Sequence, residues 1–317
     1  MAEVGCAGLL VEDTFCGPIA ALPPQGSLLV LDDMPERAGG CAANVAIDLA
    51  KQGISADVVG CIGPDVRANV LLKTFEKHGV GFSRVASVQG YRTSRTVIVL
   101  IEGEDRRYLH YVGANQAFTV EHIPRLWLSE LKVFYLGGLF ALPGINFEKL
   151  AELLAYCRSI EVLTVLDVVA PQSLRGMTQL EPLLPLIDVF VPNNDEARAF
   201  TGVTEPRDQL RAFERAGANT VIVTCGSRGA VAIRGGKTFS CGAYQMHVID
   251  PSGTGDAFTA GVIRSLLMGW DLPQTLRYAS AVGASVTRAA GTTDTLFSAA
   301  EADEYLTENP LVVAELH

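Results

Sequence analysis

The chain has 317 residues, of which 49% are hydrophobic and 19% charged, and its formal net charge is −10 at pH 7. This length and apolar content allow one large α/β domain or two ordinary ones, and the acidic balance disfavours a nucleic acid or an anionic membrane as a partner. No apolar run reaches the ~18 residues of a membrane span. Seven scattered cysteines and an N-terminus without a basic flank favour a cytoplasmic protein with reduced thiols.

The first third of the chain mixes strand and helix patterns. An apolar run over residues 4–11 predicts a buried strand, and a Pro- and Gly-rich segment follows it, with a short apolar strand at 27–31. A helix is expected at 41–51, a strand at 54–61 and an amphipathic helix at 65–77. The runs at 92–101 and 106–112 flank an acidic turn, so they predict a β-hairpin.

From residue 133 onward, strand and helix patterns alternate. Strands are expected at 133–136, 162–167, 188–191, 220–225, 230–234, 238–241 and 244–249, and helices at 147–158, 179–184, 195–200, 209–216, 255–269 and 271–287. Such alternation predicts βαβ crossovers and a mostly parallel sheet covered by helices on both faces. Residues 14–35 and 88–112 do not fit the rhythm, and we interpret them as a small β-sheet lid on a single domain spanning residues 1–317. Ligands then belong at the carboxyl ends of the strands, beneath the lid.

The segment from Asp250 to Asp256 is the most informative stretch of the chain. Gly253 and Gly255 allow a sharp turn that exposes backbone N–H groups, and the helix that follows turns its positive end toward the same point. Such a corner favours an anion, most often a phosphate. Asp256 would repel that anion unless it has a chemical task, such as taking a proton from an attacking hydroxyl. The alternative is a glycine turn with Asp256 as a helix-capping residue.

Two further stretches are candidates for acceptor binding. Gly39 and Gly40 open a helix that carries Asn44 about one turn inside, where its side chain could both donate and accept a hydrogen bond. Asp13 follows the first strand, close to the predicted ligand edge. A glycine N-cap, a surface Asn and a surface Asp are the alternatives.

Two more strand ends are candidates for nucleotide or metal binding. Asn193 and Glu196 lie three residues apart at a helix start, so both could face one hydrated Mg²⁺, although they also match a capping box. Thr224, Gly226 and Gly229 follow a strand, and the glycines would let a nucleotide lie against the backbone. A plain turn is the alternative there.

Taken together and in this order, these motifs resemble the ribokinase-like carbohydrate kinases (the PfkB family), over nearly the entire chain. Gly39-Gly40 with Asn44 is similar to the family's first motif, Asn193-x-x-Glu196 to its Asn-x-x-Glu motif, and Gly253-Thr254-Gly255-Asp256 to its anion-hole motif. The resemblance implies a three-layer α/β fold in which a central, mostly parallel sheet is flanked by helices and carries a small β-sheet lid.

The resemblance also implies roles for the individual residues. Gly253, Thr254, Gly255 and Asp256 would be catalytic, with Asp256 as the base; Asp13, Gly39, Gly40 and Asn44 would bind the acceptor; Asn193, Thr224, Gly226, Gly229 and Ser280 would bind the nucleotide; Glu196 and Asn193 would hold Mg²⁺ through water, and Asp250 is a candidate ligand for a monovalent cation such as K⁺. Ser280 stands where ribokinases often have an Asn beside the adenine. The segment 136–140 lacks the Glu that ribokinase uses near its sugar, so ribose itself is not the expected acceptor.

The resulting hypothesis is ATP-dependent phosphorylation of a hydroxyl, expected to be a primary alcohol, on a sugar or sugar-like molecule. One alternative is a nucleoside kinase of the same fold, with Phe15, Tyr91, Tyr108 and Tyr111 stacking on a base. Another is a non-catalytic sugar- or nucleotide-binding protein. The exposed strands of the lid could pair with those of a second copy, so we expect a homodimer.

Overall fold

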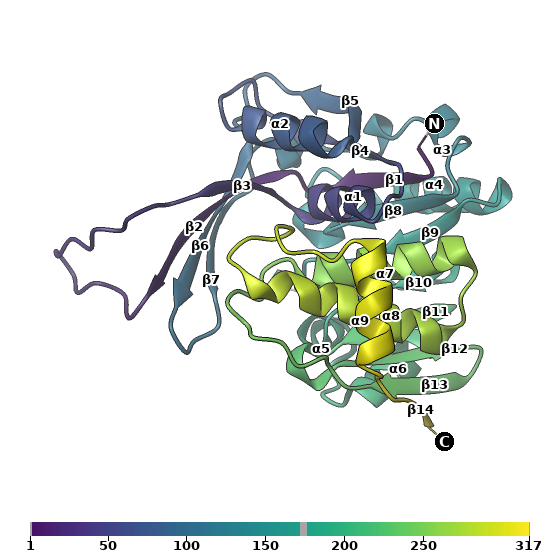
Figure 1. The fold of residues 1–317 in the computed structure, drawn as a ribbon. Helices are drawn as coiled ribbons and strands as arrows, with labels where there is room; N and C mark the ends of the chain where they lie inside the picture. Colours follow the sequence, from purple (N-terminus) through teal and green to yellow (C-terminus); the bar gives the residue numbers. More distant parts are fainter. Residues whose placement is uncertain (1, 172–175, 317) are drawn as a thin grey trace.

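The structure is a computed structural model that describes residues 2–171 and 176–316. Its largest feature is a ten-stranded sheet of order β14-β13-β12-β11-β10-β9-β8-β1-β4-β5 (Figure 1). The seven strands from β11 to β5 run parallel, and β12, β13 and β14 continue the sheet in antiparallel pairs. Their bounds are β1 Val4–Gly8, β4 Ala56–Ile62, β5 Gly81–Ser87, β8 Val133–Gly137, β9 Leu163–Leu166, β10 Val189–Phe190, β11 Thr220–Thr224, β12 Ala230–Arg234, β13 Lys237–Cys241 and β14 Val313–Leu316.

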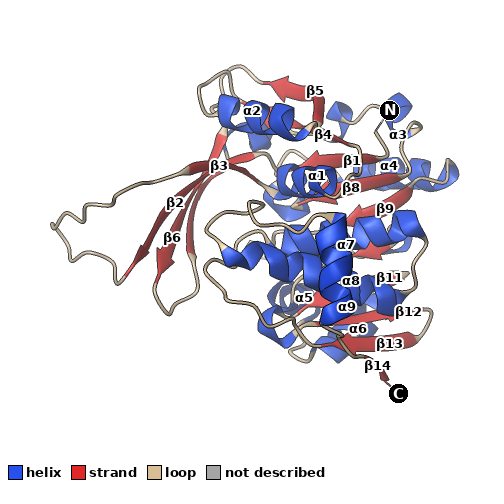
Figure 2. Cartoon of the chain, viewed as in Figure 1, coloured by secondary structure: helices blue, strands red, loops and turns tan. Residues whose placement is uncertain are grey.

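Helices cover both faces of this sheet, which confirms the predicted three-layer α/β fold (Figure 2). One face packs against α1 Cys41–Lys51, α2 Ala68–His78, α7 Thr254–Met268 and α8 Leu272–Ser285. The other packs against α3 Arg125–Leu128, α4 Phe147–Ser159, α5 Asn194–Thr201 and α6 Pro206–Arg215, while α9 Ala299–Glu308 packs on α8. Among the described helices, none is both long and apolar enough to cross a membrane.

A second sheet of four strands stands out from the edge of the main body, and we call it the lid sheet (Figure 1). Its order is β3-β2-β6-β7, with β2 Val11–Ile19, β3 Glu36–Gly39, β6 Ser94–Ile101 and β7 Arg107–Tyr111. Strands β2 and β6 pair in parallel, and the expected hairpin of β6 and β7 is present. The first expected strand, 4–11, is in fact split, because the chain leaves the main sheet after Gly8 and enters the lid sheet at Val11.

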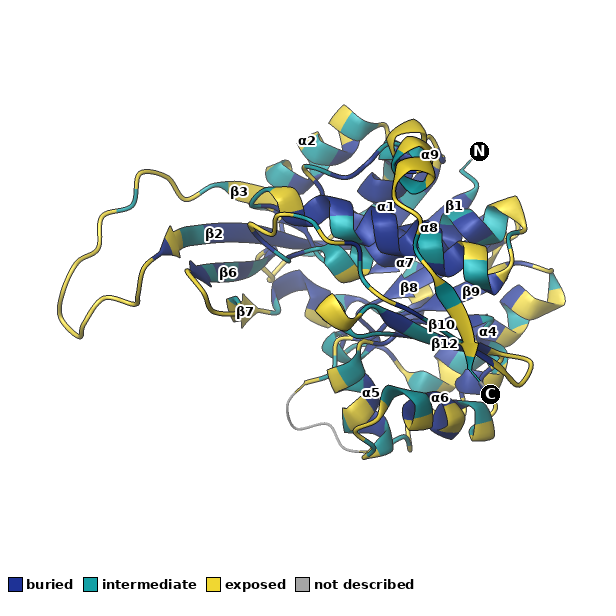
Figure 3. Cartoon of the chain, turned by 60° about the horizontal axis from the view of Figure 1, so that its bottom comes forward, coloured by how far each residue is buried: buried dark blue, intermediate teal, exposed yellow. Residues whose placement is uncertain are grey.

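Three other expectations of secondary structure were wrong. Residues 27–31 form no strand, and Leu28 and Val30 are 88% and 80% exposed, because no neighbouring strand pairs with them (Figure 3). Residues 244–249 are irregular rather than a strand leading into the segment 250–256. The helix expected at 179–184 is a series of turns that ends in the 3₁₀ turn Leu184–Leu186.

Candidate active site

The segment 250–256 forms a tight loop at the start of α7. Gly253 is the N-cap of α7 and has φ 77°, a conformation that favours glycine. A Cβ atom on Gly253 would lie 2.1 Å from the carbonyl oxygen of Thr292, so the loop also packs too closely for a side chain. The glycine is therefore required for both the turn and the packing.

This loop leaves backbone N–H groups free at the positive end of a helix. In the described part of the chain, the amides of Gly253, Gly255 and Asp256 have no acceptor. The amide of Thr254 is less available than expected, because it lies 3.4 Å from the carbonyl oxygen of Pro251, which also accepts from the Thr254 hydroxyl at 2.7 Å. Three free amides and the helix dipole make an anion site.

Asp256 lies on the first turn of α7, beside these amides. Its Oδ2 accepts a hydrogen bond of 2.7 Å from the side-chain Nδ2 of Asn44, which α1 carries. Burial raises the pKa of Asp256, while the hydrogen bonds from Asn44 and Cys41 act in the opposite direction. A carboxylate with a raised pKa, next to an anion site, has the properties of a general base.

The residues expected to bind the acceptor lie together against this base. Gly39 ends β3, where it pairs with Val11 of β2, and a Cβ atom on Gly39 would lie 1.8 Å from the Asp13 carboxylate. Gly40, the N-cap of α1, has φ 89° and would also clash if it carried a side chain, with the Leu9 carbonyl oxygen at 2.5 Å. Gly39 therefore leaves room for the Asp13 carboxylate, and Gly40 leaves room for the backbone of Leu9.

Asp13 is itself an unusual carboxylate. It is 6% exposed, and burial raises its pKa to about 7, against the hydrogen bond from Thr96, which lowers it. The negative charge of Asp256 contributes to the rise, which shows that the two carboxylates lie near each other. A buried carboxylate of this kind can accept hydrogen bonds from the hydroxyls of an acceptor.

Asn193 and Glu196 form the capping box of α5 that the sequence allowed. The Asn193 side chain accepts from the amides of Asp195 and Glu196, both at 2.9 Å, and Glu196 Oε2 accepts from the Asn193 amide at 2.8 Å. Burial raises the pKa of Glu196 to about 8, and the charge of Asp256 adds to the rise. A hydrogen bond from the Ala170 backbone acts against this rise, so the Glu196 carboxylate has two backbone partners, and the oxygen of the Asn193 side-chain amide is already used.

The expected nucleotide residues continue from this point along neighbouring elements. Asn193 forms a β-bridge with Thr224 at the end of β11. Gly226 (φ 56°) and Gly229 (φ 87°) shape the turn into β12, and a Cβ atom on Gly229 would lie 2.1 Å from the Cys241 carbonyl oxygen. The hydroxyl of Ser280, on α8, lies 3.6 Å from Cys241 Sγ. Cys241 thus lies beside both the turn into β12 and Ser280 of α8.

Asp250 has a structural role that the sequence did not reveal. It is fully buried, and its two carboxylate oxygens accept from the amides of Ser252 at 2.9 Å and Gly291 at 3.1 Å. These bonds tie the loop before α7 to the loop after α8. The role of Asp250 as a ligand of K⁺ remains a prediction.

Sequence reasoning missed two residues beside Asp256, namely Cys41 and Asp167. Ligand atoms of Cys41, Asp167 and Asp256 all lie within 4.8 Å of one another. Asp167 accepts from the Tyr135 hydroxyl and from the Gly138 amide at 2.6 Å, and burial together with the charge of Asp256 raises the pKa of Asp167 well above its usual range. The available signal was its position directly after β9, at the carboxyl end of a strand.

The lid sheet supplies fewer functional side chains than its composition suggests. Phe15 is 1% exposed and packs with Ile98 and Leu100, so it cannot stack on a ligand. The negative charge of Asp250 contributes to a raised pKa of Arg106, in the turn between β6 and β7. The Ser252 hydroxyl lies close enough to the Tyr108 hydroxyl to affect its pKa. The lid sheet therefore approaches the segment 250–256, which we call the anion loop, through these two side chains.

Two further arginines, Arg84 and Arg95, bind other side chains of the protein. Arg84 pairs with Asp57 at 3.0 Å and stacks over Trp127, while Arg95 pairs with the buried carboxylate of Glu12 at 3.0 Å. Both guanidinium groups are therefore engaged in structural ion pairs.

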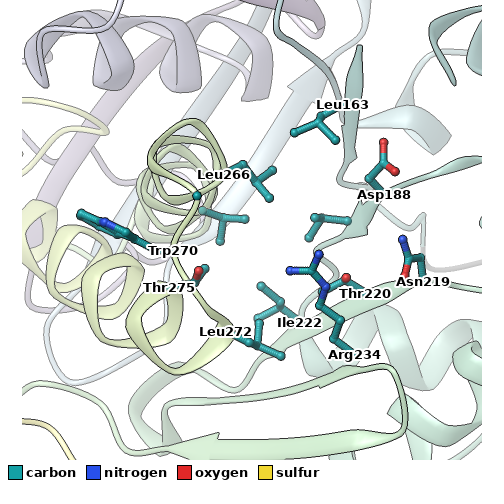
Figure 4. Close-up of a pocket in the computed structure, with 13 residues that line it drawn as sticks. Leu163, Asp188, Asn219, Thr220, Ile222, Arg234, Leu266, Trp270, Leu272 and Thr275 are labelled. Carbon is teal, nitrogen blue, oxygen red and sulfur yellow. The ribbon is translucent and has the colours of Figure 1, made fainter. Parts of the chain in front are cut away.

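A cavity of about 220 Å³ lies at the opposite end of the parallel strands and contains none of these residues (Figure 4). Leu163 and Thr220 line it at the strand starts, and Leu266 and Leu272 line it from α7 and the start of α8. This cavity is therefore separate from the candidate active site at the carboxyl ends of the strands.

Known proteins resemble this chain in sequence and in fold. The chain is 26% identical over 258 residues to the ATP-dependent 6-phosphofructokinase of Thermoanaerobacterium thermosaccharolyticum, covering 80% of each chain. It is 27% identical to the ribokinase of Haemophilus influenzae, covering 79% of this chain and 81% of that one. An E. coli structure solved in complex with ATP and Mg²⁺ superposes with a TM-score of 0.84 at 18% identity, covering 98% of this chain and 100% of that one. The model of the pfkB family carbohydrate kinases matches residues 19–298, and the chain therefore belongs to this family.

Proposed function

We propose that this carbohydrate kinase transfers the γ-phosphoryl group of ATP to a primary hydroxyl of a sugar or sugar-like molecule, with Asp256 as the general base. The observation that carries the proposal is the Asp256 carboxylate, fixed by Asn44 at 2.7 Å and flanked by three free amides at the start of α7. Phosphoryl transfer needs such positioning and charge stabilisation more than covalent chemistry.

The acceptor would lie between Asp13 and Asn44, where Gly39 and Gly40 leave room for it. Asp256 would orient the reacting hydroxyl and take its proton as the hydroxyl attacks the γ-phosphorus in line. The amides of Gly253, Gly255 and Asp256 would then stabilise the charge on the transferred group. Among the described residues, these three amides have no other acceptor, which supports this role.

The nucleotide would lie along Thr224, Gly226, Gly229 and Ser280. Glu196 would hold Mg²⁺ through water, and the Asn193 amide would keep that carboxylate in place. Burial and neighbouring negative charge raise the pKa of Glu196 to about 8, and a nearby cation would favour its charged form. When bound, Mg²⁺ would neutralise charge on the phosphates.

Exchanging the base tests the proposal. Asp256→Asn should lower kcat by ~10²–10⁴ and change the affinity for ATP far less, because ATP binding does not need the base. Asp271→Asn is the matched control, since Asp271 caps α8 and Asn caps equally well. ADP release with a panel of sugars, sugar phosphates and nucleosides would be the assay. Near-normal turnover of Asp256→Asn on the best acceptor would show that another group is the base.

A nucleoside is the second candidate acceptor, because Tyr108 is 52% exposed and lies beside Ser252 of the anion loop, where it could stack on a base. Direct competition between adenosine and free sugars for ADP formation separates the two acceptor classes.

We also infer a homodimer formed through the lid sheet. Its edge strand β7 carries exposed Leu109 and Tyr111, and an exposed edge strand with apolar side chains favours pairing with another chain.

A further inference from the structure

Thr292 lies where three parts of the active site meet. It belongs to the loop between α8 and α9 and is 4% exposed. Its carbonyl oxygen packs against Gly253 of the anion loop, and its hydroxyl reaches the opposite side, toward α1. Asp250 ties this loop to the anion loop through the Gly291 amide at 3.1 Å. The backbone around Thr292 is therefore held in place.

Two hydrogen bonds connect Thr292 to the base. The Thr292 hydroxyl donates to Asn44 Oδ1 at 3.0 Å, and Asn44 Nδ2 donates to Asp256 Oδ2 at 2.7 Å. We propose that Thr292 is a positioning residue for Asp256, because its hydroxyl holds the Asn44 side-chain amide with the NH₂ group turned toward the carboxylate. The proposal rests on the proposed function of Asp256 as a base.

The chemistry of the groups selects this orientation of Asn44. If the amide were turned over, its oxygen would face the Asp256 carboxylate, and two acceptors would stand 2.7 Å apart. The Thr292 hydroxyl has a second acceptor, the Ala38 carbonyl oxygen, but at the longer distance of 3.3 Å. An ionised Asp256 therefore requires that Asn44 Nδ2 faces it, which turns Asn44 Oδ1, the nearer acceptor, toward the Thr292 hydroxyl.

This arrangement has a consequence for the ionisation of the base. The hydrogen bond from Asn44 favours the carboxylate and so opposes the rise in the pKa of Asp256 that burial causes. Cys41 is the other group that donates to Asp256. The charge of Asp256 acts on the carboxylates of Asp13, Asp48, Asp167 and Glu196 and on the Tyr135 hydroxyl. Without the Thr292 hydroxyl, the Asn44 amide loses its fixed direction, and the carboxylate should be harder to form.

The direct test compares three variants as kinases. Thr292→Val keeps the shape of the side chain and removes the hydroxyl, Thr292→Ser keeps the hydroxyl, and Thr293→Val removes a neighbouring hydroxyl that bonds to no group in the described residues. We expect Thr292→Val to lower kcat about tenfold at mildly acidic pH, with the acid limb of the pH profile moved to higher pH and the KM for ATP unchanged. Thr292→Ser and Thr293→Val should behave like the unmodified protein.

A purely structural role for Thr292 would give a different result. An unchanged pH profile for Thr292→Val, or equal losses in Thr292→Val and Thr292→Ser, would overturn the proposal. If Thr292→Val does not fold, Thr292→Ala removes the same hydroxyl with a smaller side chain and serves in its place.

A second measurement needs no substrate and separates this proposal from the proposed function. The carboxyl carbon of Asp256 is followed by ¹³C NMR in protein labelled at aspartate, and Asp256→Asn identifies its signal. Its titration should move to higher pH in Thr292→Val and stay in place in Thr292→Ser. If the unmodified protein forms no ADP with any acceptor, the proposed function fails, and this titration still decides whether Thr292 acts on Asp256.

Discussion

Replacing Asp13 by asparagine should make the ligand-free protein less sensitive to alkaline pH. Burial raises the pKa of Asp13 from 3.8 to about 7. Because the folded protein holds this proton more tightly than the unfolded chain, the stability contributed by Asp13 is fully present below pH 3.8 and is lost as pH rises through about 7. At about 1.4 kcal/mol per pKa unit, the total loss is about 4 kcal/mol.

The assay is urea unfolding of the ligand-free protein at about pH 5 and about pH 8.5. Between these values the unmodified protein should lose about 3 kcal/mol more stability than Asp13→Asn, because asparagine has no proton to lose. Asp33→Asn, at an exposed loop position, is the control and should retain the full pH dependence. Parallel pH dependences for Asp13→Asn and the unmodified protein would refute the assignment of a buried, high-pKa carboxylate.

Three further changes have defined outcomes. Gly39→Ala should raise the KM for the acceptor tenfold or more, as measured by ADP release, because the new Cβ atom would meet the Asp13 carboxylate at 1.8 Å; an unchanged KM would place the acceptor elsewhere. Glu196→Gln should raise the Mg²⁺ concentration needed for half-maximal rate several-fold, while Glu301→Gln, in the capping box of α9, should not. Leu109→Lys on the lid sheet should shift sedimentation toward a monomer; a monomer before the substitution would contradict the dimer.

Local patterns identified much of the fold before any tertiary contact was known. The alternation of strands and helices from residue 133 onward predicted the parallel sheet, and the two strands that form the antiparallel pair β12–β13 were also predicted. The strand expected at 27–31 failed because apolar residues make a strand only where another strand offers hydrogen bonds. The same limit explains why β14 was missed, since it is a short segment that pairs with β13 at the edge of the sheet.

By itself, the sequence determined the parts of the site that depend on backbone chemistry. The positive φ angles of Gly40 and Gly253 and the capping box at Asn193 follow from residue type and spacing, because they involve neighbours within a few positions. Only the tertiary structure decided how side chains from distant segments meet. It sets Asp13 against Gly39 and brings Asp167 and Cys41 to the base. It also joins Thr292 to Asn44, 248 positions away in the sequence, and through Asn44 to Asp256, because α1 and α7 pack against each other on one face of the sheet.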